Sequence, residues 1–390
     1  MTEVFLCAAR RTPIGRYGGT LARVRPDDMA ALVIDGLLDL HPDLKVDEVV
    51  FGCANQAGED NRNVARMAVL LSGLPATVPA LTVNRLCASG LDAVILGARA
   101  IRDGADVVIS GGVESMTRAP FVMPKSEAPF ARSPEVFDTT IGWRLVNDRI
   151  RSHYGIDSMG ETAENVAEEH QVSRADQDAY ALRSQERFEA SWHGADILPV
   201  TVPGKGGGMI AADEHPRVTS LEKLASLSPA FRDGGTVTAG NSAGVNDGAA
   251  ALILASKEGV RRHRLTPLAR LGRSAVGAVE PRVMGVGPVA AVERLRQRGG
   301  AHPADCDVVE INEAFAAQVL ACLRAWGIAD DDSRVNAHGG GIAMGHPLGM
   351  TGARIAATAA RRLAEEGGRT ALATLCVGVG QGVALELLPV

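Results

Sequence analysis

The sequence predicts an α/β protein built from two similar halves, with a loop-rich region inserted between them. A chain of 390 residues is long enough for two or three domains. With 44 glycines and only 4% aromatic residues, the interior is expected to pack small and aliphatic side chains closely. We place the N-terminal half at residues 1–117 and 245–266, the inserted loop domain at 118–244, and the C-terminal half at 267–390.

The first copy of the repeated plan runs from a strand to a strand. Residues 81–84 predict a strand, a glycine-containing turn holds Cys87, and residues 91–101 predict an apolar helix. Gly104 ends that helix, and residues 107–110 form the next strand.

The second copy repeats this order near the C-terminus. Residues 335–336 precede a glycine-rich turn with His346, residues 352–364 predict an apolar helix, and residues 370–375 form a strand that leads into Cys376. A repeat of this length is too long for a solenoid, so two α/β halves are expected.

The two predicted helices match in register. Ser89-Gly90 and Thr351-Gly352 open them, and Arg99 stands at the same offset as Arg361. Both helices are apolar around most of their circumference, which is typical of a helix buried between two sheets.

The insert differs in composition from the two halves, with more charged residues, more proline and more polar loops. Residues 173–187 predict an amphipathic helix capped by Ser173, and residues 204–208 predict a flexible turn. Two interpretations stay open: the insert covers a site, or it is a structural embellishment.

Charge and hydropathy exclude several classes of protein. The net charge is −6 without a basic stripe, which argues against nucleic acid as a partner. No apolar run reaches the 18 or so residues that span a bilayer, and residues 4–9 are too short for a secretory signal. A cytoplasmic location is expected.

Six cysteines without a CxxC spacing predict neither a zinc site nor a disulfide framework. Four of them are interpreted as small buried side chains: Cys7, Cys53, Cys306 and Cys322.

Cys87 stands just before a helix, where free N–H groups and the helix dipole stabilise a thiolate. A nucleophile and a buried structural cysteine are equally compatible with this position. His346, between glycines, suits a general base, a metal ligand or a turn residue. Only His338 lies near it in sequence, so a metal site is disfavoured.

Cys376 is followed by Gly378, Gly380 and Gly382. A dinucleotide fingerprint requires a following helix, and too little chain remains for one. These glycines instead suit an exposed thiol and an oxyanion hole. Asn312 follows the predicted strand 308–311, and its side chain suits either a helix N-cap or a group that polarises water.

Five motifs together resemble the thiolase family, in order and over the full length of the chain. They are Asn84–Gly90, Gly111–Met116, Asn312–Phe315, Gly345–Gly349 and Cys376–Gly380. The resemblance implies the thiolase fold, with two α-β-α-β-α halves and an inserted loop domain. It also implies a homodimer or homotetramer, with coenzyme A as co-substrate and no tightly bound cofactor or metal.

The same resemblance implies a role for each motif residue. Cys87 would carry the acyl group, and His346 would take the proton of the Cys87 thiol. Cys376 would transfer a proton to and from the carbon or the incoming thiol. Asn312 would hold a water at one oxyanion, and the N–H groups of Cys87 and Gly380 would bind the other. Contacts with CoA would come from Arg217, Ala243, Met159 and Phe315.

Other segments resemble most the branch of the family that cleaves 3-oxoadipyl-CoA to succinyl-CoA and acetyl-CoA in aromatic catabolism. These are residues 52–66, 140–144, 154–159 and 161–184. An acetoacetyl-CoA thiolase, a ketosynthase-like enzyme and a non-catalytic CoA- or lipid-binding protein are the alternatives.

A substrate of this kind carries a distal carboxylate, which favours an arginine or a cluster of polar N–H groups in the acyl pocket. Arg118, Arg132 and Arg144 are candidates, and the sequence does not choose among them.

The chain departs from many thiolases at three positions. His338 lies in the glycine run before the base, Ala243 replaces a serine that often contacts the pantetheine arm, and Ser158 replaces a histidine of many biosynthetic members. These departures predict altered CoA affinity and a different acyl pocket.

Overall fold

The computed structural model describes residues 2–390. Its main feature is a large mixed sheet with the strand order β12-β13-β14-β11-β1-β10-β5-β3-β4, and β2 pairs with β10 at the side. The strands are β1 Val4–Arg11, β2 Gly15–Arg16, β3 Glu48–Gly52, β4 Ala80–Val83, β5 Val107–Ser115, β10 Asn246–Ser256, β11 Ala269–Ala278, β12 Val308–Ile311, β13 Ala371–Val377 and β14 Gln381–Leu388.

The strand order shows the duplication that the sequence predicts. From the centre outward, β1-β10-β5-β3 in one half corresponds to β11-β14-β13-β12 in the other. In both halves the two strands farther out are parallel, as β3 and β5 or β12 and β13, and the next pair inward is antiparallel. Residues 335–336, before the glycine-rich turn, form only a single bridge between Val309 and Val335, at the place that β4 occupies in the first half.

The expected pair of separate sheets is instead one continuous sheet. Phe5 and Leu6 of β1 pair with Arg270 and Ala269 of β11, so the two halves join edge to edge. This pairing satisfies backbone groups that two open edges would leave exposed.

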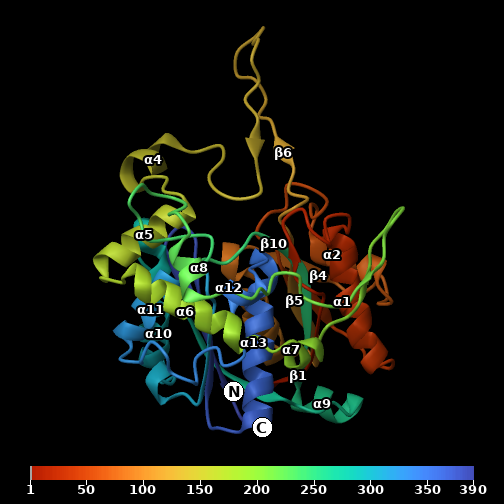
Figure 1. The fold of residues 1–390 in the computed structure, drawn as a ribbon. Helices are drawn as coiled ribbons and strands as arrows, with labels where there is room; N and C mark the ends of the chain where they lie inside the picture. The colour runs from red at the N-terminus through yellow and green to blue at the C-terminus, as the bar shows by residue number, and fades with distance from the viewer. Residues whose placement is uncertain (1) are drawn as a thin grey trace.

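Two long helices fill the interior, as their apolar sequences predict. They are α3, Ser89–Arg102, and α13, Leu348–Glu366, and they pack against each other and against strands of both halves. Helix α13 is labelled near the middle of Figure 1. Their small side chains, such as Ala93, Ala353 and Ala356, are fully buried in the main hydrophobic core.

The outer helices cover the sheet. They are α1 Pro26–Leu40, α2 Val64–Leu71, α9 Lys257–His263, α10 Gly287–Gln297 and α11 Ala316–Ala325. The short helix α12, Gly341–Met344, is buried and lies just before α13. Among the described residues, no helix is both long and apolar enough to cross a membrane.

The insert contributes five short to medium helices and two small hairpins. These elements are α4 Asp148–Tyr154, α5 Met159–Glu169, α6 Arg174–Arg187, α7 Ala190–Gly194, α8 Leu221–Ala225, β6 Phe121–Val122, β7 Phe137–Asp138, β8 Val200–Thr201 and β9 Met209–Ile210. The predicted capping by Ser173 is confirmed as a capping box with Asp176. The segment that carries β6 and β7 projects as a long arm, whereas α5 and α6 pack on α11 (Figure 1).

Candidate active site

Cys87 lies in a one-turn 3₁₀ helix, Leu86–Ala88, that leads into α3. Its half-buried side chain lines a cavity of about 330 Å³. Leu86, Met159, Leu348 and Val379 line the same cavity, together with the insert segment 139–144. The cavity is therefore assembled from both halves and the insert around one thiol.

Burial raises the pKa of the Cys87 thiol to about 11, although the Gly378 N–H bonds to the sulfur and opposes this shift. In the free protein, burial therefore outweighs the N–H groups that favour a thiolate, and Cys87 is held as a neutral thiol. A neutral thiol becomes a nucleophile only when a neighbouring base takes its proton.

His346 lies in the turn before α13 and is held at three points. Its backbone N–H donates to Asn246 Oδ1 at 2.9 Å, and its ring Nδ1 lies 2.7 Å from Thr351 Oγ1. The Thr351 hydroxyl donates to Pro347 O at 2.8 Å, so it accepts from Nδ1–H. This network assigns the proton to Nδ1 and leaves a lone pair on Nε2, 3.3 Å from Asn312 Nδ2.

The environment of His346 keeps the ring neutral. Burial first, and the positive charge of Arg354 second, lower its pKa to about 3. A neutral imidazole can accept a proton at Nε2, whose lone pair accepts a hydrogen bond from Asn312 Nδ2–H in the free protein, and accepting a proton is what a general base does.

Cys376 is buried near the end of β13. Burial, and then the charge of Cys87, raise the pKa of its thiol well above the ordinary value. The two thiols thus lie close enough to influence each other. Phe315 and Met284 pack in the same small apolar cluster as Cys376 and exclude water from this side.

Asn312 follows β12, and the interpretation of it as a helix N-cap is wrong. Helix α11 begins at Ala316, and its N-cap residue is Phe315. Within the described part of the chain, the buried Asn312 Oδ1 has no hydrogen-bond partner. A buried amide whose oxygen has no partner, beside His346, fits the other interpretation, in which Asn312 polarises a water.

The backbone N–H of Gly378 bonds to the Cys87 sulfur. The role expected of the Gly380 N–H, at an oxyanion of the substrate, stays a prediction. Gly380 has a positive φ of 80°, and its carbonyl accepts from the Val279 N–H at 2.8 Å, which anchors the turn between β13 and β14. The sequence analysis missed Gly378, although its place two residues after Cys376 was a usable signal.

Three of the four residues expected to contact CoA lie around the two thiols. Met159 lines the Cys87 cavity, Phe315 packs beside Cys376, and Ala243 donates its N–H to Ala314 O at 2.9 Å. Arg217 is exposed and donates to Ala239 O at 2.9 Å, so it braces the neighbouring loop.

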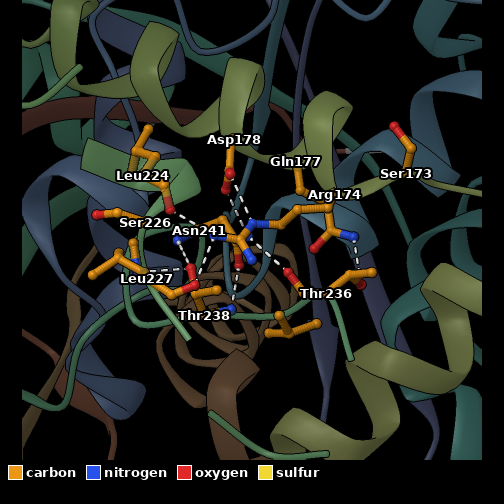
Figure 2. A network of polar contacts seen from close by, with 12 residues as sticks. Ser173, Arg174, Gln177, Asp178, Leu224, Ser226, Leu227, Thr236, Thr238 and Asn241 are labelled. Atoms are coloured by element: carbon orange, nitrogen blue, oxygen red, sulfur yellow. Dashed lines mark hydrogen bonds and ion pairs between the residues drawn. The ribbon is translucent and has the colours of Figure 1, made fainter. Parts of the chain in front are cut away.

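A polar network fixes this loop on the insert. Asp178 of α6 accepts from Arg174 Nε at 2.7 Å and from Asn241 Nδ2 at 3.0 Å, as Figure 2 shows. Asn241 O in turn accepts from Ala316 N at 2.9 Å at the start of α11. The loop that carries Ala243 is therefore hydrogen-bonded both to α6 of the insert and to α11 of the C-terminal half.

The other two departures fall in different places. His338 stacks on Trp192 with ring centroids 4.1 Å apart and lies 3.3 Å from Glu366, in a separate hollow. Ser158 caps α5 by accepting from Glu161 N, directly before the cavity residue Met159.

One buried group has ligand atoms close enough for a metal: Cys53, Asp60 and Glu114, within 4.8 Å of one another. Both oxygens of Glu114 already accept backbone N–H groups, and burial raises the pKa of all three residues. Protonated and hydrogen-bonded groups are poor metal ligands.

Comparison with known families decides the family. The family model for the thiolase N-terminal domain matches residues 4–258, and the model for the thiolase C-terminal domain matches residues 265–388. The chain belongs to the thiolase family. It is 57% identical to the beta-ketoadipyl-CoA thiolase of Pseudomonas putida, over 99% of both chains.

Two further relatives support this assignment. The chain is 54% identical to the 3-oxoadipyl-CoA/3-oxo-5,6-dehydrosuberyl-CoA thiolase of Escherichia coli K12, again over 99% of both chains. The crystal structure of human mitochondrial 3-ketoacyl-CoA thiolase matches with a TM-score of 0.91 at 38% identity, covering 100% of this chain and 99% of the other. The thiolase fold and a thiolase acyltransferase are therefore confirmed.

Proposed function

We propose that this thiolase cleaves 3-oxoadipyl-CoA with CoA, giving succinyl-CoA and acetyl-CoA, as part of aromatic catabolism. The observation that carries the proposal is the cavity in which the Cys87 thiol meets a Gly378 N–H, with a neutral His346 in the turn next to the lining residue Leu348. The acyl chain is inferred from the two relatives named above, a beta-ketoadipyl-CoA thiolase and a 3-oxoadipyl-CoA/3-oxo-5,6-dehydrosuberyl-CoA thiolase.

In the first half-reaction, His346 Nε2 takes the proton of Cys87, and the sulfur attacks carbon 3 of the substrate. The tetrahedral oxyanion is bound by the N–H groups of Cys87 and Gly380, as the motifs predict, while the Gly378 N–H bonds to the Cys87 sulfur. The bond between carbons 2 and 3 then breaks. The acetyl-CoA enolate leaves, stabilised by a water at Asn312, and takes the proton of Cys376.

In the second half-reaction, the Cys376 thiolate takes the proton of CoA, and the CoA sulfur attacks the acyl-Cys87 thioester. Cys87 leaves and recovers its proton from His346. Each residue therefore returns to its starting state, and splitting the transfer into two steps avoids one more difficult step. Met159, Ala243, Arg217 and Phe315 are proposed to bind the CoA arm.

The nearest alternative is acetoacetyl-CoA thiolase activity, and a CoA-binding protein without turnover is less well supported. The test is CoA-dependent loss of both substrates by the purified protein. A preference in kcat/KM of about 100-fold for 3-oxoadipyl-CoA, or about 2.7 kcal/mol, supports the proposal. Equal or reversed rates favour the short-chain alternative, and CoA binding without thiolysis favours the non-catalytic one.

We also propose a cytoplasmic homodimer or homotetramer with the domain limits given above. The edge strand β4 exposes Leu81, and the projecting arm exposes Phe121 and Phe130. Apolar edges and arm tips of this kind suit contacts with further copies of the chain. All six cysteines are free thiols, which suits a reducing compartment.

A further inference from the structure

The cavity at Cys87 contains a single permanent positive charge. Its lining is apolar or neutral apart from the Cys87 thiol and the guanidinium of Arg144. An acyl chain that ends in a carboxylate and enters this cavity therefore meets one cation. We propose that Arg144 binds the distal carboxylate of the acyl chain, an inference that rests on the proposed function.

The contacts of Arg144 leave its guanidinium available. Nη2 donates to Asn55 Oδ1 at 3.3 Å and Nη1 to Gly142 O at 3.4 Å, and both acceptors are neutral. No ion pair joins Arg144 to another residue of the described chain. A guanidinium has five N–H donors, so a planar edge remains for a bidentate carboxylate.

Asn55 orients Arg144 rather than competing for it. Its Nδ2 donates to Thr139 O at 3.0 Å and to Thr139 Oγ1 at 3.1 Å. These two bonds fix the amide so that Oδ1, not the NH₂ group, faces the guanidinium. Thr139 is itself buried, so the support is rigid.

The nearby carboxylate of Asp138 is engaged elsewhere. It accepts from Thr140 N at 2.8 Å, and the bonds to Thr140 are the main reason why its pKa is lowered, with Arg144 contributing least. It forms no ion pair with Arg144, so a substrate carboxylate does not have to displace one.

The other two candidate arginines are differently placed. Arg118 is paired with Glu59 through Nε and Nη2 and lines another hollow. Arg132 is exposed on the projecting arm, outside the lining of the cavity. Only Arg144 shares the cavity with the thiol that would carry the succinyl group.

The test compares 3-oxoadipyl-CoA with 3-oxohexanoyl-CoA, a neutral substrate of the same chain length. Arg144→Ala is expected to lower kcat/KM for the acidic substrate by about 10- to 100-fold, so that the preference over the neutral substrate collapses. Arg144→Lys, which keeps the charge but not the fork, should retain an intermediate preference. Arg132→Ala is the matched control from the same insert and should keep the wild-type preference.

The outcomes separate this inference from the proposed function. Wild-type protein that prefers the neutral substrate contradicts the proposed function itself. Wild-type preference for the acidic substrate that survives in Arg144→Ala contradicts only the carboxylate site. An equal loss on both substrates also overturns the inference, because it shows that Arg144 acts on the fold or on a step common to both.

Discussion

The two turns that precede the buried helices α3 and α13 are built alike but carry different chemistry. Ser89 and Thr351 are equivalent, and each hydroxyl donates to a carbonyl of its own turn while it accepts one N–H. In the first half that N–H is the backbone of Arg85, and in the second it is the imidazole of His346. The same hydroxyl position thus fixes a loop in the N-terminal half and the imidazole of His346 in the C-terminal half.

Three further pairs occupy equivalent positions in the two halves: Asn84 with His346, Glu114 with Cys376, and Cys53 with Asn312. Glu114 accepts three backbone N–H groups, from Ala54, Asn55 and Gly349. The residues of the N-terminal set therefore hold neighbouring segments together by hydrogen bonds, and one of these segments is the turn before α13. The C-terminal set keeps an imidazole nitrogen that only the Asn312 amide contacts and an unsatisfied Asn312 amide oxygen, so the comparison separates support from chemistry.

Removing the nucleophile should produce the largest effect. Cys87→Ala should lower kcat by at least about 10⁴-fold, because no other thiol lines the cavity. Mass spectrometry of the protein after mixing with substrate should show no acyl adduct, whereas the control Cys7→Ala should still acquire one. An adduct on Cys87→Ala would mean that the acyl group resides elsewhere and would break the assignment of the two halves.

The second prediction replaces His346 by asparagine, the residue type at the equivalent position of the N-terminal half, Asn84. His346→Asn should lower kcat by about 10²- to 10⁴-fold, since an amide cannot accept the thiol proton. Thr351→Val, which removes the acceptor for Nδ1–H, should also slow turnover, and Thr351→Ser should restore it. If Thr351→Val matches wild type in a pH–rate profile, the tautomer assigned above is wrong.

The sequence predicted most of the fold because its signals were local or repeated. The strands and helices around Cys87 and His346 follow from apolar periodicity and glycine turns, and α3 and α13 extend only a few residues beyond the predicted ranges. The joining of the sheets by β1 and β11 was not predictable, because it depends on which edges meet in space.

The motifs name the residues proposed for the site, but they do not give its electrostatics. The five motifs pointed to Cys87, His346 and Cys376, and the structure adds the Gly378 N–H, which bonds to the Cys87 sulfur. The helix position of Cys87 suggested a thiolate, and only the packed structure shows that desolvation prevails. Roles that depend on contacts between halves, such as that of Glu114, leave no pattern in one sequence.

A matched pair of substitutions sharpens the comparison further. Asn312→Ala should lower kcat by about 10²- to 10³-fold, the usual cost of losing one oxyanion-stabilising group. Cys53→Ala, at the equivalent position, should change kcat by less than about 3-fold, because the Cys53 thiol donates only to structural groups of a buried loop, Asn55 O and Asp60 Oδ2. Equal losses in the two variants would mean that both sets serve the chemistry.

The smallest effect concerns the stability contributed by Glu114. Burial raises its pKa to about 7 despite its three N–H donors, so the folded protein binds this proton more tightly than the unfolded chain does. The resulting stabilisation is complete below the unfolded pKa, near 4.5, and is lost as the pH rises through 7, by up to about 3 kcal/mol. Glu114→Gln removes this titration and costs about 1–3 kcal/mol through a lost N–H bond.

The difference in unfolding free energy between wild type and Glu114→Gln should therefore shrink from pH 5 to pH 8. Urea unfolding at the two pH values measures it. The buried His193, His215 and His346, whose pKa values are lowered, destabilise the fold as the pH falls below 6.5, but they do so in both proteins and cancel in the difference. A difference that grows with pH would show that Glu114 is held as a carboxylate, and hence that its N–H ties outweigh its burial.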